Sequence, residues 1–466
     1  MQFLIRFKGL FYLPLVIRFF DESLRDAGIG TWKLIMTVSP LMIPILTLNL
    51  LDGSLMFFSS DFDQESVSKK FSSVFIFSVF SFSLLLIPVG FFLSNNETFS
   101  SYWLQIISLA FAMFIFKAGL MLLQCYQKAK KIVLVQFISE YGSSTISVVC
   151  VIFTSSFKAM LYPIIGINLL LGIGLLIYVF REIKFRFEVN FSFIKKCVIV
   201  ALPLIPVHVS EWVLNSIGIF QIEAFHGLEL VGKFTYLLSI CALVLILKAT
   251  LPFFWYSTAS NLLRNKKEEE FKNIFEFVFQ GYLILVVFAF LLINFFGDVL
   301  ITIMYTKENL ELLKNPVVFY GGAYGLLILA SLFNGILYAL GKTFVILCSY
   351  IVSSFILASF GYLLIPKYGL LGASLSAVAS NLVLFISMSF FSARYLAINL
   401  YSIFFKITFF CALFVVLSLS LKFIFDLSYW QYKIAGCIVV LFYLVLVGII
   451  KKNELLRLIN IIKKKL

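Results

Sequence analysis

The sequence predicts an all-α polytopic membrane protein with about 14 transmembrane helices. Hydrophobic residues make up 62% of the 466 positions, and charged residues only 13%, about half the charged share of a typical soluble domain. The mean hydropathy is +1.04. Apolar stretches of about 20 residues, long enough to cross a bilayer as a helix, recur from end to end. The loops between them are too short to hold a soluble domain.

The first expected span lies at the N-terminus, where a basic start precedes an apolar stretch. That pattern is also typical of a secretory signal. However, Arg18 interrupts the apolar part and no small-residue cleavage site follows, so we expect a retained helix. The expected spans are 3–20, 32–57, 71–94, 101–124, 132–155, 161–180, 196–220, 231–257, 273–296, 316–340, 343–365, 369–391, 403–424 and 430–450.

The basic residues predict the orientation of these spans. The chain has 37 Lys and Arg residues and a net charge of +14, and most of the basic residues fall in alternate loops and in the C-terminal tail. Cytoplasmic loops carry this excess. We therefore expect both termini in the cytoplasm and an even number of spans. The alternating pattern argues against nucleic acid as a partner.

Weak internal similarity suggests two halves of parallel topology. The segment GIGTWKL at 28–34 resembles LVGKFTY at 230–236, and YQKAKK at 126–131 resembles YALGKT at 338–343. The expected division is an N-terminal lobe at 1–190, a C-terminal lobe at 191–396, and two further helices with a basic tail at 397–466.

The stretch LIPKYGLLGAS at 364–374, with the Gly-Lys turn at Gly341–Lys342 before it, resembles the polysaccharide (O-antigen, Wzx-type) flippases. These belong to the multidrug/oligosaccharidyl-lipid/polysaccharide exporter superfamily. The segments at 28–35, 201–215 and 231–239 are similar to the family as well. The resemblance implies two lobes of about six helices around a central cavity, plus two C-terminal helices.

The resemblance also implies a location in a bacterial inner membrane and a function. The substrate would be an oligosaccharide repeat unit of O-antigen or a related surface polysaccharide, carried on undecaprenyl pyrophosphate. The cavity would open alternately to the two sides of the membrane while the lipid tail stays in the bilayer. A polysaccharide polymerase and a chain-length regulator are candidate partners, and H⁺ or Na⁺ are candidate coupling ions.

Four basic residues lie within or at the edges of expected spans and are candidate ligands for a diphosphate head group: Lys248, Lys117, Arg18 and Lys33. A charge inside a membrane usually faces the helix bundle or a water-filled path. The helices of Arg18, Lys33 and Lys248 correspond to cavity-lining helices of the superfamily. The alternative is that these long side chains reach the membrane surface as anchors.

Two further residues are candidates for ion coupling or pairing. His208 and Glu211 are three positions apart and so share a helix face. Glu211 could pair with Lys248 or carry a coupled proton. Alternatively, His208 and Glu211 could form a plain hydrogen-bonded pair with one another. Pro203 and Pro206 are expected to kink this helix. Asp52 is expected to act in capping or pairing.

The sequence lacks catalytic, nucleotide-binding and metal-binding motifs. Its seven cysteines are scattered singly and only two histidines are present, so we expect no cofactor, no metal and no enzymatic activity. Two alternatives remain open. One is a cation-coupled multidrug exporter of the same superfamily, which should prefer acidic cavity residues. The other is a membrane polysaccharide polymerase or acyltransferase, for which a large external loop or an acceptor-site motif is missing.

Overall fold

The computed structural model is helical throughout the residues that it describes, and no strand occurs in them. These residues are 12–20, 22–58, 64–125, 128–154, 156–182, 188–264, 267–305, 308–396, 412–421, 431–443 and 445–446. The helices are α2 (Glu22–Leu46), α3 (Leu50–Phe58), α4 (Gln64–Asn95), α5 (Trp103–Cys125), α6 (Ala129–Phe137), the π-helix η1 (Ile138–Gly142), α7 (Ser143–Thr154), α8 (Phe157–Glu182), α9 (Phe191–Ala201), α10 (Leu204–Arg264), α11 (Glu268–Met304), α12 (Glu308–Ala339) and α13 (Thr343–Leu396).

These helices confirm the predicted all-α membrane fold. Within the described ranges, nine helices are long and apolar enough to cross a membrane. The long helices α10 and α13 each contain a turn, because Gly227 (φ 78°) and Gly369 (φ 52°) adopt left-handed backbone angles that favour glycine. Each is therefore a hairpin of two expected spans. The predicted spans 3–20, 403–424 and 430–450 lie partly outside the described residues.

The chain forms two compact units. Unit 1 comprises the described residues up to Ser239 together with Ser354–Gly369, and unit 2 comprises Ile240–Ser353 and the described residues from Leu370 onward. Two helices, α10 and α13, therefore contribute to both units. The division into lobes at residues 190 and 396 stays a prediction.

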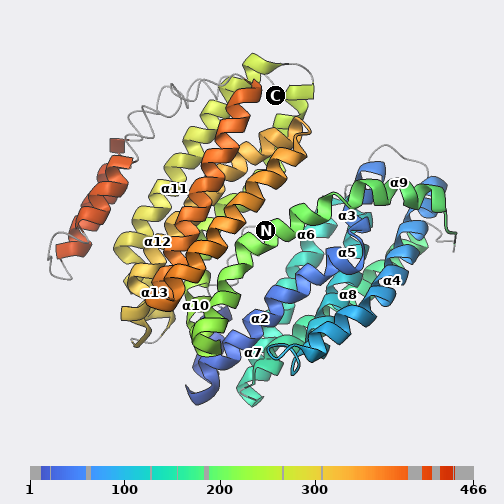
Figure 1. The fold of residues 1–466 in the computed structure, drawn as a ribbon, viewed down its shortest axis with the longest axis horizontal. Coiled ribbons are helices and arrows are strands. Elements are labelled where there is room, and N and C mark those ends of the chain that lie inside the picture. The colour runs from blue at the N-terminus through green and yellow to red at the C-terminus, as the bar shows by residue number, and fades with distance from the viewer. Residues whose placement is uncertain are drawn as a thin grey trace. The chain divides into compact units, whose positions relative to one another are not determined.

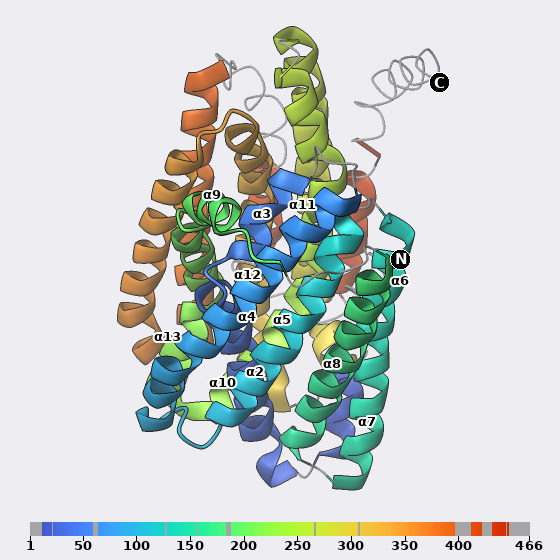
Figure 2. The same ribbon diagram turned by 90° about the vertical axis from the view of Figure 1, so that its right-hand side faces the viewer.

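In unit 1, α5 packs against α2, α3, α4 and α8, which run alongside one another in Figures 1 and 2. The core between these helices is rich in aromatic side chains. Phe71 of α4 and Phe114 of α5 are fully buried, and Phe193 of α9 joins them. Burying a phenylalanine stabilises a fold by about 1.5–3 kcal/mol. This packing holds α3 against α5, where the candidate site lies.

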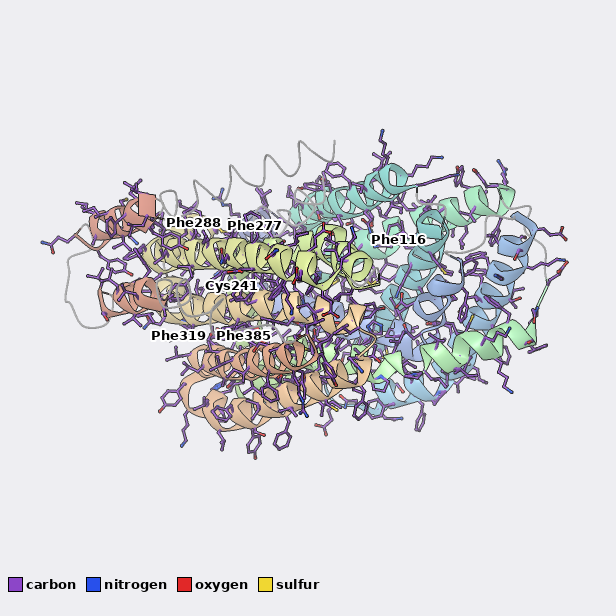
Figure 3. All side chains as sticks on the ribbon, turned by 90° about the horizontal axis from the view of Figure 1, so that it is seen from above. Phe116, Cys241, Phe277, Phe288, Phe319 and Phe385 are labelled. Carbon is purple, nitrogen blue, oxygen red and sulfur yellow. The ribbon has the colours of Figure 1, made fainter. Side chains whose placement is uncertain are left out.

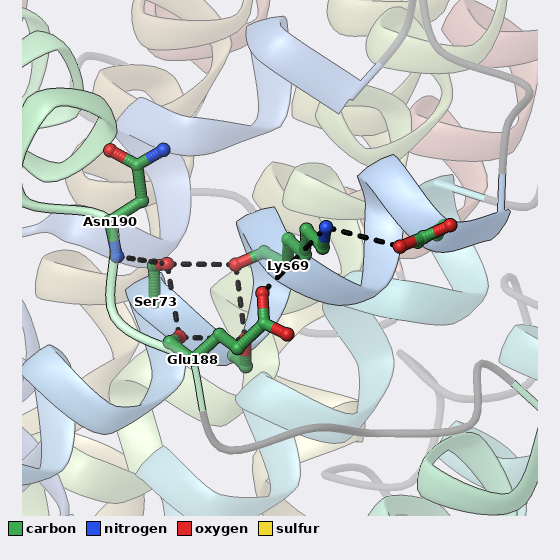
Figure 4. Close-up of polar contacts among 6 residues, drawn as sticks. Lys69, Ser73, Glu188 and Asn190 are labelled. Atoms are coloured by element: carbon green, nitrogen blue, oxygen red, sulfur yellow. Dashed lines mark hydrogen bonds and ion pairs between the residues drawn. The ribbon is translucent and has the colours of Figure 1, made fainter.

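The connection into α9 is tied to α4 by a set of polar contacts (Figure 4). The Asn190 amide donates to Ser73 Oγ at 2.9 Å, and Asn190 Oδ1 caps α9 by accepting from the Phe193 amide at 3.0 Å. Lys69 pairs with Glu65 at 3.1 Å and lies 3.9 Å from Glu188. The start of α9 is thus fixed on the end of unit 1 that carries the predicted cytoplasmic lysines.

In unit 2, α11 packs against α12. An apolar cavity of about 390 Å³ lies between α11, α12, α13 and the helix Ala412–Leu421. Phe319 and Phe385, labelled in Figure 3, line it. The helix Gln431–Tyr443 is attached to α11 because Lys433 forms an ion pair with Asp298.

Candidate functional site

Three charged or titratable side chains meet inside unit 1, from three different helices. Lys117 of α5 donates a hydrogen bond to Asp52 Oδ2 of α3 at 2.7 Å. His208 Nε2 of α10 lies 3.9 Å from the same Asp52 oxygen. Of the predicted site residues, the structure therefore brings Lys117 and His208 together, around an aspartate for which the sequence predicted capping or pairing. We call Asp52, Lys117 and His208 the charge cluster.

A break in the second span places Asp52 in this position. The sequence predicts one helix over 32–57, but α2 ends at Leu46 and α3 begins at Leu50. Leu48 and Asn49 adopt φ angles of 51° and 52°, which is uncommon for residues other than glycine and signals local strain. Pro44 lies in the last turn of α2, and asparagine tolerates the left-handed conformation. These two residues are the sequence signal for the break.

The break also puts Asp52 in the first turn of α3. A carboxylate is favourable there because the amino end of a helix carries partial positive charge. Similarly, α9 ends at Ala201 and α10 begins at Leu204, so two helices meet at Pro203, where a kink in one helix was predicted, and Pro206 lies within α10. His208 consequently lies near the start of α10, where it faces α3.

The charge cluster is open to its surroundings. The exposed fractions are 39% for the Lys117 side chain, 27% for Asp52 and 40% for His208. Charged groups with this exposure at membrane depth normally line a water-accessible path, because contact with lipid would be costly. When His208 is neutral, the cluster carries no net charge, since Lys117 and Asp52 compensate one another.

Lys33 has a different environment. It is half-buried on α2, and among the described residues its ammonium group has no hydrogen-bond or ion-pair partner. It lies between two contacts of α2 with α10. One turn away, the Thr37 carbonyl accepts a hydrogen bond from Trp212 Nε1 at 2.7 Å. On the other side, a Cβ added at Gly30 would lie 2.1 Å from the Leu228 carbonyl oxygen.

Comparisons with known proteins identify a relative in sequence and several proteins of similar fold. No protein-family model matches the chain. Over 218 residues it is 26% identical to the capsular polysaccharide biosynthesis protein CapF of Staphylococcus aureus, a match covering 46% of this chain and 54% of the relative. The match thus spans about half the length of that curated relative. The lipid II flippase MurJ, in an inward closed conformation, superposes with a TM-score of 0.72 at 14% identity, covering 97% of this chain and 98% of that one.

A multidrug resistance MATE transporter of the MOP superfamily, in an inward-facing conformation, superposes with a TM-score of 0.63 at 13% identity. That match covers 85% of this chain and 95% of the transporter. The chain has the MOP superfamily fold. This fold confirms the predicted all-α polytopic architecture, and it makes this a multi-pass membrane protein.

The remaining predicted residues lie apart from the charge cluster. Arg18 is exposed on the helical segment 12–19, and Lys248 is half-buried in the part of α10 that belongs to unit 2. Glu211 is half-buried in unit 1, and its backbone carbonyl accepts from Asn215 at 2.7 Å. The pairing of Glu211 with Lys248 stays a prediction, as do the roles of all six residues.

Sequence reasoning missed a second group of polar contacts, which lies at the start of α2. Asp26 accepts a hydrogen bond from Tyr236 at 2.5 Å and lies 3.8 Å from Lys233. Lys233 also pairs with Glu229 at 2.6 Å. A signal was present, because Lys233 and Tyr236 belong to the segment that resembles 28–34.

Proposed function

We propose that the protein is a flippase that moves undecaprenyl-pyrophosphate-linked oligosaccharide repeat units across a bacterial inner membrane by alternating access. The repeat units would belong to O-antigen or a related surface polysaccharide. The similarity to a capsular polysaccharide biosynthesis protein supports this substrate class, and the shared fold with a lipid II flippase supports a lipid-linked substrate. Both termini and the basic loops would lie in the cytoplasm.

The environment of Lys33 is the observation that favours an anionic substrate. A lysine within a membrane-spanning helix, without a counter-ion among the described residues, is suited to an anionic ligand. In contrast, Asp52 is already engaged by Lys117 at 2.7 Å, so it is poorly placed to attract a cationic drug. Among the described residues, Lys33 thus offers a positive charge without a counter-ion, which is what a diphosphate head group requires.

Complementation tests the proposal. The chain is expressed in a bacterium that lacks its own repeat-unit flippase but makes the cognate lipid-linked repeat unit, and surface polysaccharide is quantified. We expect wild type to restore it. Lys33→Gln should reduce it about tenfold or more, since a charge-assisted hydrogen bond contributes about 1.5–3 kcal/mol. Lys367→Gln, at an exposed lysine, is the matched control and should restore it fully at equal membrane levels.

A multidrug exporter is the second candidate, favoured by the fold shared with a MATE transporter. The same strains decide between the two. Growth in cationic drugs, without recovery of surface polysaccharide, would contradict the flippase and support drug export.

A further inference from the structure

The charge cluster places two bases on one carboxylate oxygen. Lys117 Nζ is 2.7 Å from Asp52 Oδ2 and His208 Nε2 is 3.9 Å from it. Lysine is charged at neutral pH, whereas histidine ordinarily changes charge between about pH 5 and 8. The net charge of the cluster therefore rises from zero to one positive charge when His208 takes up a proton.

Proton uptake changes the cluster in two ways that act in the same direction. A charged His208 is attracted to Asp52 and competes with Lys117 for the shared oxygen. It also repels the Lys117 ammonium group, which is 39% exposed and can turn toward the water-accessible side. Both effects make Lys117 more available to an anion. By linkage, an anion bound at Lys117 must in turn favour protonation of His208.

Few other titratable groups lie on the elements around His208. Among the described residues, Asp52 of α3 is the one carboxylate within ion-pair distance of the imidazole. Glu211 lies one turn further along α10. On α9, Lys195 and Lys196 are exposed and Cys197 is buried, and on α4 the Lys70 ammonium group donates to the Phe57 carbonyl at 3.4 Å.

We propose that His208 is a proton-binding positioning residue, which couples proton uptake to binding of an anionic diphosphate head group at Lys117 through their shared partner Asp52. The inference rests on the proposed function, since it assigns a proton as the coupling ion of the flippase. Lys33 is a second basic group, elsewhere on α2, whereas the charge of the cluster depends on the protonation of His208.

The test measures binding of farnesyl diphosphate, a short prenyl diphosphate, to the full-length protein in lipid nanodiscs by calorimetry between pH 5.5 and 8. The probe itself loses charge at low pH, so each variant is compared with wild type at the same pH. Wild type should bind about five- to tenfold more tightly than His208→Gln at pH 5.5, and equally at pH 8. His226→Gln is the matched control at the other histidine, and it should follow wild type at every pH.

Two further variants, Asp52→Asn and Lys33→Gln, give separate expected changes in affinity. Asp52→Asn frees Lys117 permanently, so affinity at pH 8 should rise by a similar factor. Lys33→Gln should weaken binding at all pH values. When His208→Gln is added to Lys33→Gln, it should change the affinity at each pH by the same factor as it does in the wild-type protein. A pH-independent ratio between wild type and His208→Gln would overturn the coupling and leave the flippase intact. Absence of probe binding by wild type at every pH would overturn both.

Discussion

At the residue scale, two lysine–carboxylate pairs differ in how much water they meet. Lys117 and Asp52 retain 39% and 27% exposure, whereas Lys433 and Asp298 retain only 10% and 13%. Lys433 also donates to the Phe295 carbonyl. Partial exposure lowers the cost of separating a pair, and burial raises it, because a buried charge without its partner is strongly disfavoured. The first pair is suited to rearrangement and the second to holding helices together.

The buried pair gives a stability prediction. Lys433→Met leaves Asp298 unpaired and should destabilise unit 2 by about 3–5 kcal/mol, seen as a lower Tm of the detergent-solubilised protein. Replacing both residues, as Lys433→Met with Asp298→Leu, should recover most of the loss. Lys367→Met at the protein surface is the control. If Lys433→Met had the same Tm as wild type, the ion pair would not be what holds the helix Gln431–Tyr443 to α11.

At the element scale, α2 and α10 approach unusually closely through two glycines. A Cβ at Gly30 would lie 2.1 Å from the Leu228 carbonyl oxygen, and a Cβ at Gly232 would lie 2.1 Å from that of Asp26. Small residues allow such contacts between membrane helices. Gly30 and Gly232 occupy equivalent positions in the segments 28–34 and 230–236, so the two segments with similar sequences pack against one another.

This contact predicts a specific sensitivity to a methyl group. Gly30→Ala should destabilise the protein by about 1–3 kcal/mol, because both backbones must move apart. Gly218→Ala, on α10, is the matched control, since nothing lies within 4 Å of its added Cβ. Thermal unfolding in detergent measures both. If the two variants melt together, the close approach is not required for stability.

At the scale of the whole molecule, the lysines that predict a cytoplasmic face gather at one end of unit 1. Lys69 lies on α4 beside Asn190 at the start of α9 (Figure 4), and Lys70 lines the same pocket as Asn190 and Phe193. Lys128 pairs with Glu182 at 2.5 Å. That hydrogen bond raises the pKa of Lys128, so the lysine stays charged at neutral pH and above. The gathering of lysines at this end supports the proposed orientation, because cytoplasmic loops carry an excess of lysine and arginine.

Cysteine labelling measures this orientation. In a background without the seven native cysteines, Lys130→Cys and Lys367→Cys replace two exposed side chains. A membrane-impermeant maleimide should label Lys367→Cys in intact spheroplasts, and Lys130→Cys only after permeabilisation. The reverse pattern would invert the proposed topology.

Much of the fold was predictable because it depends on local composition. The glycine turn at Gly227 falls between two predicted spans, the turn at Gly369 falls at the start of the span predicted for 369–391, and α9 ends just before Pro203. The break at Leu48–Asn49 was missed, because it interrupts an apolar stretch whose hydropathy does not change. Lys117 and His208 were identified as candidates by type and depth. Their meeting at Asp52 was not, because the three residues are far apart in the chain.

The sequence by itself determined the helical membrane architecture, since bilayer thickness and backbone hydrogen bonding leave an apolar chain little choice. It also determined the family resemblance and the identity of most intramembrane charges. Only the tertiary structure decided which charges are compensated. Lys117 is neutralised by Asp52 and Lys33 is not, because side-chain partners at membrane depth depend on how α2, α3, α5 and α10 pack rather than on any local pattern.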